Sequence, residues 1–101
     1  MTPTELGREH GQDYAVETWH ADPADYDTAT EWCVTAEAGT LHDYYLPSPF
    51  DETPNDLDTA GWSWGELADY ENAWTQAYLS RTTELMRGVI DGYYDRAESE
   101  A

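Results

Sequence analysis

The segment SWGELADYENAWTQAYLSRTTELMRGVIDGYYD, residues 63–95, decides the fold. Apolar and small residues recur in it at intervals of three and four, the spacing that gathers side chains on one face of an α-helix. The residues on this face are Leu67, Tyr70, Trp74, Ala77, Tyr78, Arg81, Leu85, Gly88, Val89 and Gly92. The pattern predicts a helix of around 30 residues, about 45 Å long, from Trp64 nearly to Asp95 unless the two glycines bend it. Ser63 and Glu66 form a capping box at its start.

Two further helices are expected before this segment. Thr2-Pro3-Thr4-Glu5 is a capping box with proline at the first helical position, which predicts a helix from about Pro3 to Trp19. Asp22-Pro23 repeats that signal and predicts a helix over 23–38, with Gly39 as its stop. The strand-forming residues Thr30, Trp32, Val34 and Thr35 leave a short hairpin at 30–46 as an alternative.

The remaining residues connect these helices. A capped turn is expected at 40–43, and residues 46–58 form an acidic, proline-rich loop in which Thr53-Pro54-Asn55-Asp56 is another capping signal. Residues 97–101 are expected to fray. The sequence thus predicts one mainly helical, all-α domain over 1–101, with three to four helices, or an α+β fold if the hairpin forms.

The composition indicates what the core is made of. Leu, Ile, Val and Phe supply only 12 of the 101 residues, but the chain has five Trp and eight Tyr. Each of these rings can bury roughly 150–250 Å², so we expect a core built largely of aromatic side chains. The pairs Gly7/Gly11, Gly61/Gly65 and Gly88/Gly92 are interpreted as room for a ring or a crossing helix, and self-association into a homodimer stays open.

The charge restricts the partners. There are 22 Asp and Glu against four Arg, and the formal net charge is −18. Such a chain repels nucleic acid and anionic membranes and attracts basic surfaces. Cys33 is the only cysteine, and no signal peptide or long apolar span is present, so we expect a cytoplasmic protein without disulfides.

Catalytic and metal-binding patterns are incomplete. Glu17-x-x-His20 matches one ligand pair of a di-iron bundle, but no second pair exists. Asp56-x-Asp58 opens like a calcium loop, but Leu67 stands where a bidentate Glu is needed. His10, His20 and His42 match no catalytic arrangement. We therefore expect no enzyme activity, no cofactor and no metal.

The acids form two candidate binding strips. Glu5, Glu9, Asp13 and Glu17 are four residues apart, which places like charges side by side on a helix and costs ~0.2–0.5 kcal/mol per pair. The second strip lies in the loop and comprises Asp51, Glu52, Asp56 and Asp58, and the neighbouring Trp62 and Trp64 are candidate interface anchors.

A row of carboxylates about 6 Å apart along a helix resembles the phosphates of a DNA strand. We therefore expect a DNA mimic that binds the basic, nucleic-acid-binding surface of another protein. Two alternatives remain open: a small structural or accessory protein that pairs through its aromatic faces, and an acidic surface adapted to high salt.

The motifs Gly7-Arg8-Glu9-His10-Gly11 and Pro47-Ser48-Pro49, with a late helix containing Tyr70-Glu71, resemble small acidic proteins of actinobacteria and their phages. No activity or site residue is carried over from that set, and the tryptophan-rich stretch 61–65 departs from it. The resemblance implies a mobile-element context, in which the partner is a host protein such as a CRISPR effector or a restriction enzyme, met in the host cytoplasm.

Overall fold

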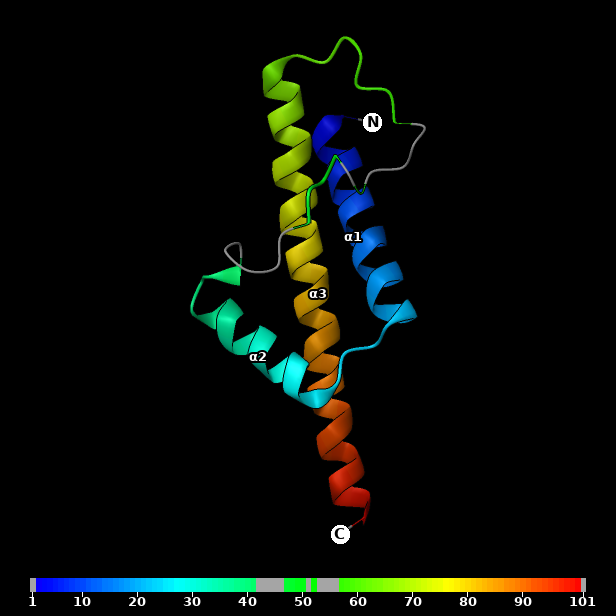
Figure 1. Cartoon of the computed structure of the whole chain (residues 1–101), viewed down its shortest axis with the longest axis vertical. Coiled ribbons are helices and arrows are strands. Elements are labelled where there is room, and N and C mark those ends of the chain that lie inside the picture. Colours follow the sequence, from blue (N-terminus) through cyan, green and yellow to red (C-terminus); the bar gives the residue numbers. More distant parts are fainter. Residues whose placement is uncertain (1, 42–46, 51, 53–56, 101) are drawn as a thin grey trace.

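The computed structural model describes residues 2–41, 47–50, 52 and 57–100, with side chains as far as Tyr94. These residues form three α-helices and no strand: α1 (Pro3–Ala21), α2 (Tyr26–Glu37) and α3 (Trp64–Glu100) (Figure 1). The predicted all-α fold with a long C-terminal helix is confirmed. Helix α3 has 37 residues and continues through both of its late glycines, beyond the predicted end near Asp95.

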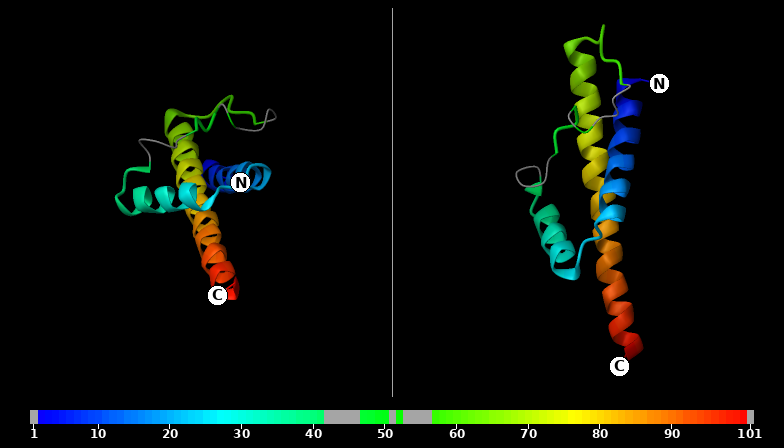
Figure 2. Two further views of the ribbon diagram at one scale, coloured as in Figure 1. Left: turned by 60° about the horizontal axis from the view of Figure 1, so that its bottom comes forward. Right: turned by 45° about the vertical axis from the view of Figure 1, so that its right-hand side comes forward.

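Helix α3 is the axis of the molecule, and α1 lies along its first half (Figures 1 and 2). The two helices are parallel, because contacts advance together along both: Gly7 meets Tyr70, and twelve residues later Trp19 meets Thr82. Helix α2 crosses α3 obliquely further along, and the C-terminal end of α3 projects beyond both (Figure 1).

Two of the predicted capping boxes are in place. At α1 the backbone N–H of Glu5 donates to the Thr2 hydroxyl at 3.2 Å. At α3 the exchange is reciprocal: Glu66 N–H donates to Ser63 Oγ, and Ser63 N–H donates to the Glu66 carboxylate, both at 3.1 Å. These bonds satisfy N–H groups that a helix start otherwise leaves without partners.

The predicted start of the second helix at Pro23 is wrong by three residues. Asp22 instead ends α1, with its N–H donating to the Thr18 carbonyl at 3.2 Å. Asp25 is the N-cap of α2, accepting from Thr28 N–H at 2.8 Å, and this bond lowers the pKa of the Asp25 carboxyl. Gly39, at φ 75°, follows the end of α2 as predicted.

The hairpin alternative is also wrong where the structure describes the chain, because residues 30–37 are helical. Its strand-forming threonines are accommodated by bonding back to the helix: Thr30 Oγ1 donates to the Tyr26 carbonyl at 2.9 Å, and Thr35 Oγ1 to that of Glu31 at 2.8 Å. The predicted turn at 40–43, the far arm of the hairpin and the capping signal at 53–56 fall largely or wholly outside the described residues.

The core is aromatic, as predicted. Trp32, Tyr70, Trp74 and Tyr78 are each at most 4% exposed. The rings of Trp74 and Tyr78 stack with their centroids 5.4 Å apart. Ala15, Ala29, Leu41 and Met86 fill the space between the rings. Two indole N–H groups attach the outer helices to α3: Trp19 of α1 donates to Thr82 at 3.2 Å, and Trp32 of α2 to Thr83 at 3.0 Å.

The first glycine pair explains how closely α1 and α3 pack. A Cβ added at Gly7 would overlap the carbonyl oxygen of Tyr70, and one at Gly11 would overlap that of Trp74. The interpretation as room for a crossing helix is confirmed for this pair. Within this molecule it is wrong for the other two pairs: an added Cβ at Gly61, Gly88 or Gly92 would meet nothing within 4 Å, and one at Gly65 only Ser63 Oγ at 3.8 Å.

Candidate interaction surface

The acidic row of α1 points away from the body of the protein. Gly7, Gly11 and Ala15 face α3 and are buried, and the opposite side of the helix carries the exposed acids Glu5, Glu9, Asp13 and Glu17. Successive acids rise about 6 Å along the helix. Because α1 is held against α3 by backbone-to-backbone contact, the row stands on a rigid support.

Two of the four acids of the predicted loop strip lie among the described residues. Glu52 and Asp58 are exposed, whereas Asp51 and Asp56 lie outside the described residues. Asp58 also has a local structural role, since its Oδ1 accepts from Ala60 N–H at 2.9 Å and shapes the turn before α3.

The two tryptophans predicted as anchors are in different environments. Trp62 is half-buried and packs on Tyr70 with ring centroids 5.6 Å apart, so it belongs to the edge of the core. Trp64 is 88% exposed at the first turn of α3. Of the two, Trp64 alone presents its ring to solvent.

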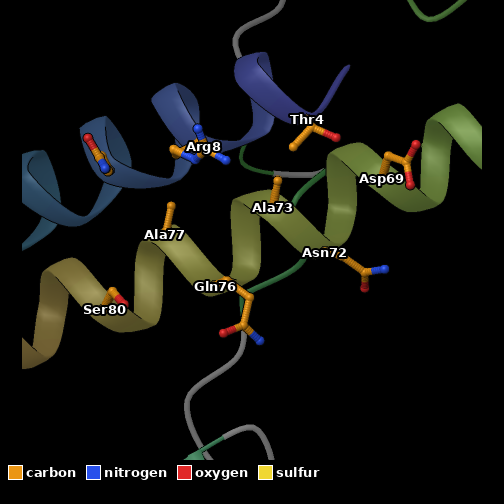
Figure 3. A pocket seen from close by; sticks show the side chains of 9 residues that line it. Thr4, Arg8, Asp69, Asn72, Ala73, Gln76, Ala77 and Ser80 are labelled. Carbon is orange, nitrogen blue, oxygen red and sulfur yellow. The ribbon is translucent and has the colours of Figure 1, made fainter. Parts of the chain in front are cut away.

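A groove between α1 and α3 that is lined mostly by polar residues adjoins the acidic row, and the sequence did not predict it. It has a volume of about 480 Å³. Ala73 and Ala77 point from α3 toward α1, whereas Asn72 and Gln76 point away from α1 (Figure 3). Its remaining lining residues are Thr4, Arg8, Gln12, Asp69 and Ser80.

A second depression of about 320 Å³ continues this groove, with Asp13 of the acidic row and Val16 on its α1 side. On the α3 side, Arg81 Nη1 donates to Glu84 Oε2 at 2.8 Å, an exposed ion pair within one helix. The groove and the acidic row therefore share one side of the molecule.

His10, His20 and Cys33 lie among the described residues, and His42 lies outside them. His10 Nδ1 lies 2.8 Å from the Tyr70 hydroxyl, at the edge of the core. His20 and Glu17 are both exposed, and among the described residues no group of three metal-ligating side chains lies together. Burial raises the pKa of the Cys33 thiol, which keeps it protonated among the apolar residues it packs against.

Neutralising the middle of the row is expected to stabilise the fold. The variant Glu9→Gln with Asp13→Asn removes all three like-charge pairs of the row, which corresponds to about 1 kcal/mol at low salt and less as salt screens the repulsion. Urea unfolding at low and high NaCl measures this. The control Glu37→Gln with Glu71→Gln changes the charge equally, but neither residue has an acid three or four positions away on its helix. An equal gain in both variants would contradict specific repulsion along the row.

Alkaline pH is expected to destabilise the fold through Tyr78. Burial raises the pKa of this phenol above its usual 10.0, with a further contribution from Tyr14. The unfolded chain then releases the proton before the folded chain does, so stability is present below about pH 10 and declines as the pH rises past it. Tyr78→Phe is expected to lose less stability than the wild type between about pH 9 and pH 11 in urea titrations. An unchanged pH dependence would contradict this assignment.

Comparison with protein-family models, with curated proteins and with solved structures finds no match. Within the described residues, no helix combines the length and the apolar character that crossing a membrane requires.

Proposed function

We propose that this protein is a non-enzymatic inhibitor that mimics DNA and occupies the nucleic-acid-binding surface of another protein. The observation that carries the proposal is the row Glu5, Glu9, Asp13 and Glu17, exposed along one side of a helix whose other side is fixed to the core. A row of like charges destabilises its own helix, so its presence is accounted for when a basic partner neutralises it.

The proposed partner is a DNA- or RNA-binding enzyme, such as a restriction enzyme or a CRISPR effector in the host cytoplasm. The Lys and Arg side chains that bind phosphates in such an enzyme would bind the carboxylates of the row instead, with the strong salt dependence of phosphate contacts. The net charge of −18 would steer the two proteins together at long range.

The proposal is tested by affinity capture. The immobilised protein is exposed to a cell lysate, washed and eluted first with duplex DNA and then with a salt gradient, and the released proteins are identified by mass spectrometry. A nucleic-acid-binding protein displaced by DNA supports mimicry. Recovery of no such protein, or of one that neither DNA nor salt releases, contradicts it.

A second function, as an accessory protein that packs through aromatic side chains, is favoured by one observation. Trp64 is 88% exposed, and Tyr93 and Tyr94, which pack around Tyr26 of α2, are about half exposed. Trp64→Ala tests this function, because it would abolish the captured contact while leaving the core intact. Trp62→Ala would be a poor test, since Trp62 packs on buried Tyr70.

A further inference from the structure

A small apolar pocket lies where α1 ends beside α3. Its volume is about 190 Å³, and its walls come from the last turns of α1, the α1–α2 link and the middle of α3. The lining residues are Val16, Trp19, His20, Ala24, Leu85, Met86 and Val89. The pocket lies where α1 stops at Ala21 while α3 continues, and two of its α3 residues, Leu85 and Val89, are only partly buried.

The charges around this pocket indicate what could cover it. Val16, which is 41% exposed, lines both the pocket and the adjoining depression, which contains Asp13 and the ion pair of Arg81 with Glu84. Glu17 follows Val16 on α1 and is exposed. An apolar pocket with carboxylates on its rim is complementary to an apolar side chain that has basic residues one helical turn away.

The α3 surface beyond the pocket suits a helix. Gly88 and Gly92 follow Leu85 on the same side of α3 that α1 covers nearer the N-terminus of α3. An added Cβ at either glycine would meet nothing within 4 Å. Glycine in a helix interior lowers helix stability, so two of them on one open side need a reason. Gly7 and Gly11 of α1 show the effect of such a pair within this molecule, because they let the backbone of α3 come into direct contact with α1.

We propose that this pocket receives one large apolar side chain from a basic helix of the partner, whose Lys or Arg side chains reach Asp13 and Glu17. The inference rests on the proposed function, and it adds an apolar contact to the charged contacts of the acidic row. A second copy of this chain is disfavoured as occupant, because each copy carries a charge of −18.

The probe for this test is a capped helical peptide of alanine and lysine with one central phenylalanine. The matched peptide has alanine at the centre and the same charge. Burial of the phenyl ring is expected to make the first peptide bind about tenfold more tightly to the wild-type protein at ~0.15 M salt, measured by calorimetry. In NMR spectra of the same mixture, binding is expected to shift the methyl signals of Val16, Leu85 and Val89. The signals of Val34, which is 62% exposed on α2, should not shift.

Two variants locate the effect. Ala24→Leu fills the pocket without a change of charge and is expected to abolish the preference for phenylalanine. Val34→Leu adds a methylene outside the pocket and should leave the preference unchanged. The methyl shifts need no variant, so the test stands even if Ala24→Leu does not fold.

Equal affinity of the two peptides for the wild type, or shifts centred on Val34, would overturn the pocket assignment. If both peptides bind equally and their affinity still falls steeply with salt, the pocket assignment is overturned but the acidic surface remains a site for basic partners. The proposed function fails separately, when duplex DNA releases no captured protein.

Discussion

Gly11→Ala is expected to destabilise the protein by about 1–3 kcal/mol, although alanine is the better helix former. The new Cβ would overlap the carbonyl oxygen of Trp74 and crowd its carbonyl carbon and Cα, which are backbone atoms and cannot turn aside. Helices α1 and α3 would have to separate, and the bond from Trp19 to Thr82 lies further along the same interface. Urea unfolding followed by tryptophan fluorescence measures the loss.

The matched control lies on α3. Gly88→Ala makes the same chemical change at a helix position with open space around it, and it is expected to stabilise the protein by about 0.5–1 kcal/mol. Opposite signs for the two variants would establish the close contact of α1 with α3. Stabilisation by both would contradict it, because only helix propensity would then be acting.

Reversing the charge at Glu9 and Asp13 is expected to weaken binding to the captured partner by about 10- to 100-fold. Lysines at these two positions would place positive charges against a basic surface in the middle of the row. The fold itself should remain intact or gain stability, because both residues are exposed and the repulsion of Glu9 from Glu5 and of Asp13 from Glu17 becomes attraction. Affinity at several salt concentrations, with unfolding curves beside it, separates the two effects.

Glu37→Lys with Glu71→Lys is the control for this prediction. It changes the net charge by the same amount at exposed positions on α2 and α3. If binding depends on the row, the control loses much less affinity than the Glu9 and Asp13 variant. An equal loss in both would show that only the total charge matters, and an unchanged affinity in the row variant would remove the row from the interface.

Local signals in the sequence were sufficient for the helices. Ser63 and Glu66 begin α3 as their spacing predicts, because a capping box is a contact within four residues. Asp22 and Asp25 are both good N-caps, and the sequence alone favoured the first. The choice depends on where α1 ends, and Asp22 is used there as the C-cap.

The site was predictable only where it lies on one helix. The outward direction of Glu9 and Asp13 follows from their position opposite Gly7 and Gly11, so the exposed row could be derived from periodicity. The separation of Trp62 from Trp64 could not, because it depends on Tyr70 lying beneath Trp62.

The groove also depends on tertiary structure. Arg8 and Gln12 on α1, and Asn72 and Gln76 on α3, are polar pairs four residues apart, a spacing that any solvent-facing helix shows. They line one groove only because α1 and α3 run parallel in a register that brings Gly11 onto Trp74. That register is set by the packing of small residues against backbone, a contact between segments far apart in the sequence.

The most direct test of the central claim is a competition between this protein and DNA for the purified partner. The apparent Kd of the complex is measured by fluorescence anisotropy at rising concentrations of a duplex that the partner binds, at constant ionic strength. If the acidic row occupies the nucleic-acid site, the apparent Kd rises linearly with the duplex concentration and doubles when that concentration equals the partner's own Kd for DNA. An apparent Kd that stays constant while the partner becomes saturated with DNA would contradict the account.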